Sequence, residues 1–172
     1  MALANEKNAV SGAKTPILIT YFSWSGNTRE IANEIRRQIG GDLFEINALN
    51  PYPTDYNECV TQAKKELDSS ARPPLVAKVT DIASYDTVFI GYPNWWDTMP
   101  TPLFTFLETH DLSGKTVAPF CTHGGGEFGR SVKDLKKLCA NAVFVKGIAI
   151  NDSLVKRSKE NITGWLNDIA SV

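Results

Sequence analysis

This sequence lacks a surplus of charge of either sign. Its 172 residues include 18 Lys and Arg and 19 Asp and Glu, which gives a net charge of -1 with both histidines neutral. Proteins that bind nucleic acid or anionic membranes through phosphate groups carry an excess of basic side chains. The balance therefore gives no reason to expect nucleic acid or a membrane as a partner, and any ligand must be argued from local features.

Cysteine is sparse as well. The chain has three, Cys59, Cys121 and Cys139, and no two of them form a C-x-x-C pair. Disulfide frameworks and structural zinc sites need more cysteines at closer spacing. The pattern is typical of a reduced, intracellular protein whose cysteines are small core residues.

Long apolar runs are also missing. No segment approaches the roughly 18 consecutive apolar residues of a membrane-spanning helix. The first fifteen residues, MALANEKNAVSGAKT, are small and polar and hold no apolar stretch that could form the core of a signal peptide. We therefore expect a cytoplasmic protein with a disordered leader over residues 1–15 and one domain over residues 16–172.

What the sequence does contain is a regular alternation of short apolar runs and longer amphipathic stretches. The runs predict five strands, at residues 17–21, 43–46, 87–90, 116–120 and 143–150. Helical spacing of apolar residues predicts a helix after each strand, and the last helix carries apolar residues from Leu154 to Ile169. Strands that are apolar throughout are typical of a parallel sheet with helices on both faces. The pattern therefore predicts an α/β fold.

Two features of the predicted sheet are less regular. Pro119 lies inside the fourth strand, which counts against a central position because proline lacks the N–H that a ladder needs. Residues 75–79, LVAKV, could add an edge strand. Ligands of open parallel sheets bind beyond the carboxyl ends of the strands, where the strand order reverses. If the order is 2-1-3-4-5, the loops after the first, third and fourth strands meet at such an edge.

The loop after the first strand, SWSGNT at residues 23–28, is rich in neutral hydrogen-bond donors. It offers the hydroxyls of Ser23, Ser25 and Thr28, the amide of Asn27 and backbone N–H groups around Gly26. A helix N-terminus binds a phosphate through such groups without a basic side chain. Without the lysine of a Walker A loop, the segment predicts a terminal monophosphate. Helix capping alone is the simpler alternative, although it needs only one of these side chains.

The loop after the third strand holds two adjacent tryptophans. Trp95 and Trp96 lie between Pro93 and Pro100 and follow Asn94. Tryptophan on a rigid loop is suited to stacking on a flat aromatic ligand. The alternative is burial of both rings in the core. Because neighbouring side chains point in different directions, we expect at least one of the two to contact a ligand.

The loop after the fourth strand is rich in glycine. Gly124, Gly126 and Gly129 formally match G-x-G-x-x-G, a fingerprint of dinucleotide-binding folds. That fingerprint belongs to the first strand-to-helix turn, whereas here it follows the fourth strand. We interpret the glycines as letting the backbone N–H groups of residues 122–126 approach the polar edge of a planar ring. A phosphate, an aromatic ring and a polar edge together describe flavin mononucleotide (FMN).

The three motifs resemble those of the flavodoxin family. SWSGNT is similar to the phosphate loop T/S-x-T/S-G-N-T of flavodoxins, and YPNWWDTMPTPLFTFLE and THGGGEFGRS are similar to the second and third flavin loops of a bacterial flavodoxin-like subfamily. The resemblance runs from about Pro16 onward, without the long insertion of long-chain flavodoxins. It implies a doubly wound five-stranded parallel sheet in the order 2-1-3-4-5, a three-layer α/β/α sandwich and tightly bound FMN.

The resemblance also implies which residues contact FMN. The phosphate would be bound by Ser23, Trp24, Ser25, Gly26, Asn27 and Thr28, with Trp24 and Gly26 contributing backbone N–H groups. The isoalloxazine ring would be flanked by Pro93, Asn94, Trp95 and Trp96. Its pyrimidine end would be lined by Thr122, His123, Gly124, Gly125 and Gly126. No metal ligand is implied.

Two functions are compatible with such a site. An electron carrier would pass electrons through FMN between a reductase and an acceptor protein, as a monomer or weak dimer, and the small size favours it. The alternative is an FMN-dependent NAD(P)H:quinone-type oxidoreductase, because dedicated carriers of the family are usually strongly acidic and because His123 could donate a proton near the flavin. We expect His123 to be an exposed loop residue instead, and His110 to be structural. The intact phosphate loop disfavours a binding module that has lost its cofactor.

Overall fold

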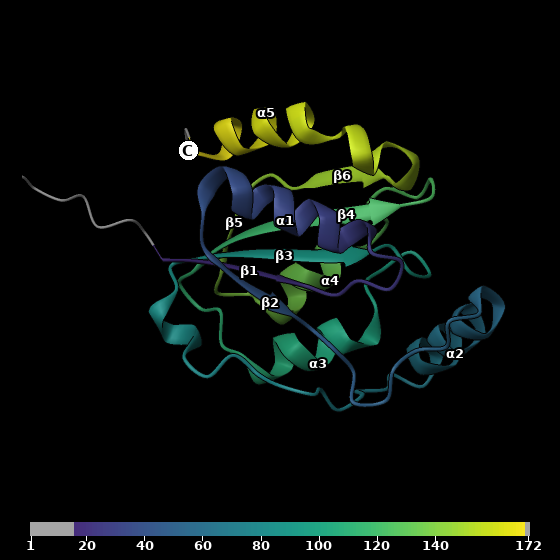
Figure 1. The fold of residues 1–172 in the computed structure, drawn as a ribbon. Coiled ribbons are helices and arrows are strands. Elements are labelled where there is room, and N and C mark those ends of the chain that lie inside the picture. Colours follow the sequence, from purple (N-terminus) through teal and green to yellow (C-terminus); the bar gives the residue numbers. More distant parts are fainter. Residues whose placement is uncertain (1–15, 171–172) are drawn as a thin grey trace, which may run out of the picture.

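The computed structural model describes residues 16–170 and contains a parallel sheet between two layers of helices (Figure 1). The strands are β1 (Ile17–Tyr21), β2 (Asp42–Glu45), β3 (Thr87–Pro93), β4 (Thr116–His123), β5 (Val143–Phe144) and β6 (Ile148–Asn151). The helices are α1 (Asn27–Ile39), α2 (Tyr56–Asp68), α3 (Thr101–Thr109), α4 (Ser131–Leu138) and α5 (Lys159–Ala170), with 3₁₀ segments η1 (Ile82–Ser84) and η2 (Asp152–Arg157). The leader predicted over residues 1–15 lies outside the described residues, as do residues 171–172.

The strand order confirms the predicted fold. The strands follow the order β2-β1-β3-β4-β5, every neighbouring pair is parallel, and β6 pairs with β4. Helices α1 and α5 cover one face of the sheet, and α3 and α4 cover the other (Figure 1). The remaining helix, α2, lies beyond the carboxyl ends of the strands instead of on either face. It therefore stands at the edge where the three candidate loops leave the sheet.

Both faces of the sheet are buried under helices. Leu18 of β1 packs with Leu103 of α3 in one apolar layer. The next residue, Ile19, points to the opposite face and packs with Ile35 of α1 in the second layer. Successive side chains of a strand point to opposite faces, so a strand covered on both sides must be apolar at nearly every position. This explains why the strands appear in the sequence as continuous apolar runs.

The residues predicted to be structural are buried. The thiols of Cys59, Cys121 and Cys139 are buried and free. His110, which follows α3, accepts a hydrogen bond at Nε2 from the N–H of Val79 (3.1 Å). Its ring proton is therefore on Nδ1, which lies 2.8 Å from the carbonyl oxygen of Phe106 and donates to it. Both ring nitrogens of His110 are used within the fold.

The prediction of a single fifth strand over residues 143–150 is wrong in one respect. It consists of two short strands, β5 and β6, separated by residues 145–147. Val117 of β4 pairs with Phe144, and Phe120 of β4 pairs with Ile148. The segment from Phe144 to Ile148 is thus one residue longer than the segment from Val117 to Phe120 of β4, with which its ends pair. One extra residue on one strand forms a β-bulge, which ends the local pairing.

Pro119 of β4 explains this interruption. The carbonyl oxygen of Val117 accepts from the N–H of Val145 (3.0 Å), so the backbone of Val117 points toward β5. Two residues on, the backbone of Pro119 points the same way and has no N–H to donate. Gly147 lies against it, since a Cβ there would be 2.7 Å from the Pro119 carbonyl oxygen. Pro119 was expected to count against a central position, but β4 lies inside the sheet between β3 and the β5 and β6 strands, and its neighbour bulges instead.

Two other predicted elements differ in the structure. The last helix is broken into η2 and α5 at Ser158, whose hydroxyl donates to the carbonyl oxygen of Val155 (2.7 Å). Residues 75–79 do not form a strand, because only Leu75 pairs, in an isolated antiparallel bridge with Ala48. Between residues 16 and 170, none of the helices combines the length and the apolar character needed to cross a membrane.

Candidate functional site

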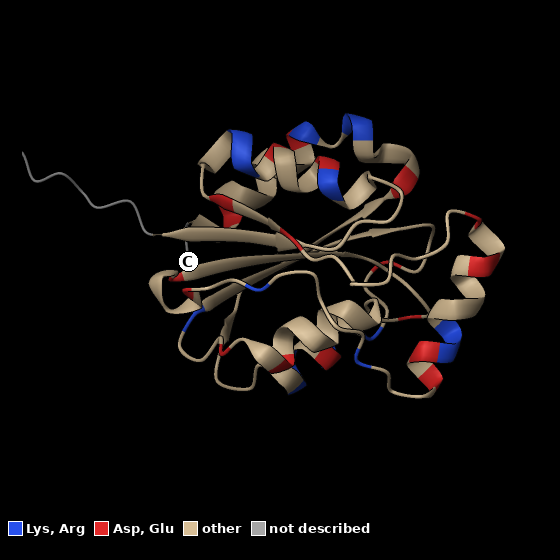
Figure 2. Ribbon diagram, turned by 60° about the horizontal axis from the view of Figure 1, so that its bottom comes forward, with Lys and Arg blue, Asp and Glu red and all other residues tan. Residues whose placement is uncertain are grey.

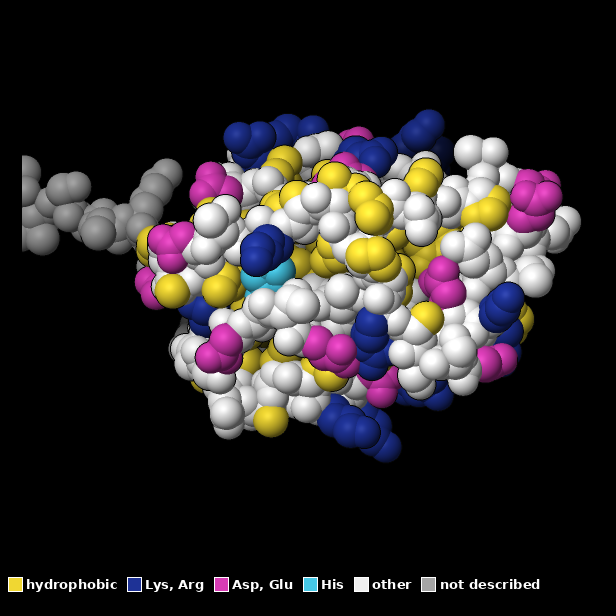
Figure 3. Space-filling view, turned by 90° about the horizontal axis from the view of Figure 1, so that it is seen from below, with side chains coloured by type: hydrophobic (Ala, Val, Ile, Leu, Met, Phe, Trp, Pro, Cys, Tyr) yellow, Lys and Arg dark blue, Asp and Glu magenta, His cyan; other side chains and the backbone are white. Residues whose placement is uncertain are grey.

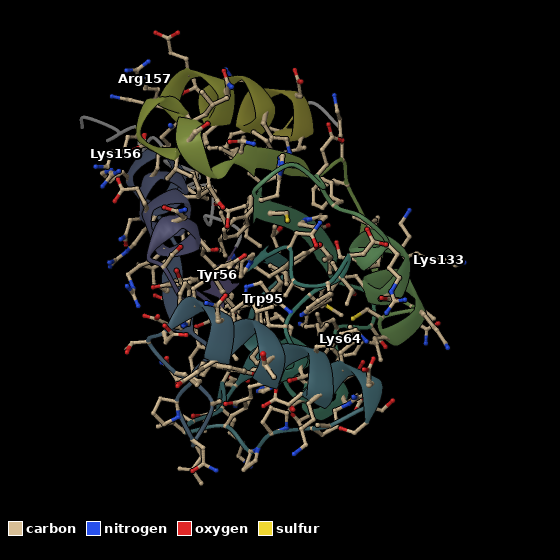
Figure 4. The ribbon with its side chains drawn as sticks, turned by 90° about the vertical axis from the view of Figure 1, so that its right-hand side faces the viewer. Tyr56, Lys64, Trp95, Lys133, Lys156 and Arg157 are labelled. Atoms are coloured by element: carbon tan, nitrogen blue, oxygen red, sulfur yellow. The ribbon has the colours of Figure 1, made fainter. Side chains whose placement is uncertain are left out.

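A cavity of about 430 Å³ lies at the carboxyl ends of β1, β3 and β4, bordered by α2. Its wall is formed by Trp24, Ser25, Asn27, Pro93, Asn94, Trp95, Trp96, Thr122, His123, Gly124, the α2 residues Tyr56, Cys59, Val60 and Ala63, and Asp152. All three loops predicted to share a site therefore meet at one place. Figure 4 looks onto this edge and shows Tyr56 and Trp95 near its middle. The predicted site residues outside the wall are Ser23, Gly26, Thr28, Gly125 and Gly126.

The first loop turns into α1 at Gly26. Gly26 has a left-handed backbone (φ +94°), which glycine adopts without strain, and it precedes the first helical residue, Asn27. The hydroxyl of Ser23 accepts from the N–H of Arg29 (3.2 Å), and that of Ser25 lies 3.5 Å from the N–H of Asn27. Both hydroxyls thus lie beside the N–H groups of the first turn. They lie where an anion at this helix end would meet them.

Thr28 has a different position from the rest of the loop. Its side chain is buried, and its hydroxyl lies 2.9 Å from the hydroxyl of Thr122 at the end of β4. Trp24, at the other end of the loop, donates its indole N–H to the carbonyl oxygen of Pro53 (2.9 Å). These two contacts fix the loop to the sheet and to the segment before α2.

The second loop makes a tight turn through its tryptophans. The N–H of Trp95 donates to the carbonyl oxygen of Thr98 (2.9 Å), and the reverse bond is 3.1 Å. Trp96 (φ +51°) and Asp97 (φ +67°) are both left-handed, as in a type I′ turn. The carbonyl oxygen of Asp97 accepts from the N–H of Arg130 (2.8 Å). This hydrogen bond therefore connects the turn to the end of the third loop.

The two tryptophans have different surroundings. The ring of Trp95 packs edge-on against Phe22 (centroids 5.3 Å apart) and Tyr52 (5.0 Å), so its orientation is fixed by the core. Trp96 is 46% exposed and donates its indole N–H to the carbonyl oxygen of Val60 in α2 (3.1 Å). Both rings line the cavity. The alternative in which both tryptophans are buried in the core is therefore wrong for Trp96.

The third loop begins inside β4, which extends to His123. The prediction that His123 is an exposed loop residue is wrong, because its side chain is only 8% exposed and lines the cavity. The strand continues because His123 pairs with Asn151 of β6. Among the described residues, its Nδ1 has no hydrogen-bond partner. Asn94 ties the second loop to the third, since its amide donates to the carbonyl oxygen of Glu127 (2.8 Å).

Helix α2 contributes site residues that the sequence did not indicate. Tyr56, Val60 and Ala63 lie at helical spacing on one apolar face, but nothing in that spacing shows that the face borders a cavity. Cys59 shares that face, and burial raises the pKa of its thiol to about 11, so it stays protonated at neutral pH. Asp152 has no local sequence signal, because it enters the site only through the strand pairing of β6.

The position of α2 is fixed by a half-buried carboxylate. Glu66 accepts hydrogen bonds from the hydroxyls of Thr101 (2.6 Å) and Tyr52. Tyr52 also packs against Trp95, so this contact connects α2 to the tryptophan loop. Burial and the neighbouring Glu66 raise the pKa of Tyr52 far above its usual value, so its hydroxyl remains a donor.

Comparison with known proteins gives the family of the chain. A family model described as Flavodoxin matches residues 16–169. The chain belongs to the flavodoxin family. This confirms the resemblance drawn from the three loop motifs, and the strand order is the one that the flavodoxin family implies.

Several relatives of this flavodoxin-family chain share its fold. A Bacteroides eggerthii protein assigned to the flavoproteins is 38% identical, with a TM-score of 0.79 over 90% of this chain and 98% of its own. A Lactobacillus acidophilus flavoprotein solved in complex with FMN is 26% identical, with a TM-score of 0.68 over 83% of this chain and 97% of its own. An NAD(P)H dehydrogenase (quinone) from Acidovorax ebreus is 27% identical over 122 residues, or 64% of this chain and 60% of its own length. The chain spans between 55% and 60% of the length of three curated relatives that it matches.

Proposed function

We propose that this flavodoxin-family protein binds FMN in the cavity and acts as an electron carrier. The observation that carries the proposal is the convergence of three unlike features on one cavity. These are the neutral donors at the start of α1, the adjacent tryptophans after β3 and the glycine-rich backbone at the end of β4. The L. acidophilus relative in complex with FMN supports the same cofactor.

The start of α1 fits the phosphate of FMN. The first turn of a helix presents N–H groups at the positive end of its dipole, and the hydroxyls of Ser23 and Ser25 lie beside that turn. We assign the phosphate to these hydroxyls, to the amide of Asn27 and to the backbone N–H groups of residues 24–28. Thr28 would contribute only its N–H, because its hydroxyl is bonded to Thr122.

The other two loops fit the ring. We assign the face of the isoalloxazine to Trp95 and Trp96, flanked by Pro93 and Asn94, and its polar edge to residues 122–126. When bound, FMN supplies reversible transfer of one or two electrons. The protein's own residues bind it, orient it and exclude water from its ring. The core contacts of Trp95 favour a fixed ring orientation.

The size of the cavity favours a carrier. About 430 Å³ is near the lower end of the range of about 300–1,000 Å³ for small-molecule sites, which leaves little room for a second substrate beside a flavin. A carrier needs no such room, since a docked partner protein would exchange electrons with the bound flavin directly. We propose that a reductase and an acceptor dock here, where Tyr56 and Trp96 are exposed.

The distribution of charge favours docking through these aromatic side chains. Acidic and basic residues are interspersed along the helices, α2 included (Figure 2), and side chains of both signs are mixed over the face seen from below in Figure 3. Electrostatic steering of a partner requires a patch of one sign. We therefore expect association with redox partners to depend only weakly on salt concentration.

A second candidate function is an FMN-dependent NAD(P)H:quinone-type oxidoreductase. The observation that favours it is His123, which is buried in the cavity wall and could hold a proton beside the flavin. The names of the curated relatives point the same way, although this chain spans little more than half of their length. The two candidates share the cofactor and differ in the source of electrons.

One preparation tests both candidates. The purified chain is titrated with FMN, and binding is followed by quenching of flavin fluorescence; failure to bind contradicts both. The FMN complex is then mixed anaerobically with NADH or NADPH. The carrier is expected to keep its oxidised spectrum until an NADPH-dependent flavodoxin reductase is added. Rapid bleaching by NADH or NADPH alone, with turnover on a quinone, would favour the oxidoreductase.

A further inference from the structure

A carboxylate lies beside the loop that we assign to the phosphate. The amide of Asn27 donates to Oδ1 of Asp152 (3.0 Å), and both residues line the cavity next to Ser25. Asp152 opens η2 directly after β6, and β6 pairs with the end of β4. Three distant segments of the chain therefore bring an acid to the phosphate end of the site.

No basic side chain balances this acid within the cavity wall. Among the described residues that line the cavity, Asp152 is the only Asp or Glu, and there is no Lys or Arg. Arg29 is near the same helix end, but it is paired with Glu45. Lys156 and Arg157 lie at the margin of this edge in Figure 4, away from Tyr56 and Trp95. The wall thus carries a net negative charge from its side chains.

The field of Asp152 extends to the neighbouring strand. Burial is the main cause that raises the pKa of the Cys121 thiol to about 12, and the negative charge of Asp152 adds to it. Cys121 lies two residues before His123, so the same field acts on the end of β4 that borders the cavity. A phosphate dianion at the start of α1 would be subject to that repulsion.

Resting on the proposed function, we propose that Asp152 sets the flavin specificity of this site by weakening its preference for FMN over riboflavin. A phosphate dianion accepts hydrogen bonds and is repelled by a carboxylate. The terminal hydroxyl of riboflavin is neutral and can donate to Asp152, as Asn27 does now. The same carboxylate therefore opposes one ligand and assists the other.

The experiment compares the two flavins on the full chain and on Asp152→Asn. Asparagine keeps an oxygen for the bond from Asn27 and removes only the charge. Dissociation constants are measured for FMN and for riboflavin by flavin fluorescence quenching. We expect Asp152→Asn to bind FMN roughly tenfold tighter, the effect of one unit charge a few ångströms away in a largely aqueous setting. Riboflavin affinity should stay the same or fall.

Two further measurements separate charge from structure. Asp168→Asn removes an equal charge from an exposed position on α5 outside the cavity wall, and it should leave both affinities unchanged. The gain in Asp152→Asn should shrink as salt is added, because Asp152 is exposed and its field is screened. FMN binding with an unchanged ratio of the two dissociation constants, or an equal change for both flavins, overturns this inference alone. If neither flavin binds the unaltered protein, the proposed function fails and the inference falls with it.

Discussion

The hydroxyls of Thr28 and Thr122 lie 2.9 Å apart, although 94 residues separate them in the sequence. This contact joins the first turn of α1 to the end of β4, and so joins the two ends of the candidate flavin site. Both side chains are almost fully buried. The bond therefore matters for the fold as well as for the geometry of the site.

Thr122→Val should leave the hydroxyl of Thr28 buried without its partner. We expect the free energy of unfolding to fall by about 1–3 kcal/mol, measured by urea denaturation. The double variant Thr28→Val/Thr122→Val removes both hydroxyls and should recover part of that loss. Equal losses in the single and double variants would contradict a direct bond between the two side chains.

The two tryptophans should respond differently to truncation. Trp96→Ala is expected to weaken FMN binding by on the order of 1 kcal/mol with little change in stability, because Trp96 is half exposed. Trp95→Ala should lower both FMN affinity and stability, because that ring also packs on Phe22 and Tyr52. Leu49→Ala, an exposed apolar residue away from the cavity, is the control. Unchanged FMN affinity in both tryptophan variants would contradict the assignment of the ring.

Gly129, at the end of the third loop, should tolerate a larger side chain poorly. It has φ +51°, and a Cβ there would lie 2.5 Å from the carbonyl oxygen of Asp97, in the turn that carries Trp96. Gly129→Ala combines left-handed strain of roughly 1–2 kcal/mol with a clash that costs about 1–3 kcal/mol more. Gly114→Ala, at φ +74° with nothing within 4 Å, isolates the strain alone. In thermal unfolding, Gly129→Ala should therefore have a clearly lower unfolding temperature than Gly114→Ala.

The reactivity of Cys59 should report on cavity occupancy and on pH. Because burial raises the pKa of its thiol to about 11, the thiolate fraction grows with each pH unit up to about 11. An ordinary thiol levels off near its own pKa of about 8.5. Labelling with iodoacetamide, followed by peptide mass spectrometry, should accelerate from pH 7 to pH 10 and slow when FMN is added. Cys139 also has a raised pKa of about 11 but does not line the cavity, so FMN should leave its rate unchanged.

The sequence was sufficient for most of the strands and for the three loops, because these depend on local patterns, whereas the strand order followed from the resemblance to the flavodoxin family. Apolar runs identify strands buried on both faces, and polar or glycine-rich loops follow particular strands. The split between β5 and β6 could not be predicted, since it arises where Pro119 faces a strand more than twenty residues away. Strand pairing with Asn151 likewise explains why His123 stays in β4, despite the glycines that follow it.

The position of α2 was unpredictable for a different reason. An apolar helix face has the same spacing whether it packs on a sheet or borders a cavity. Only the tertiary contacts of Glu66 and Val60 decide between the two. Asp152 was missed because a single acid after a strand has no distinctive pattern.

The placement of α2 beyond the strands also divides the protein into parts of unequal local stability. Only Cys59 and Ala63 of this helix are buried, while the two apolar layers of the sheet close under the other four helices. A segment with few buried contacts can unfold locally at a free energy far below that of global unfolding. Native-state hydrogen exchange should therefore show α2 amides opening first, with those of β3 and β4 opening last. The wall of the cavity could then open and close repeatedly while the sheet beneath it stays folded.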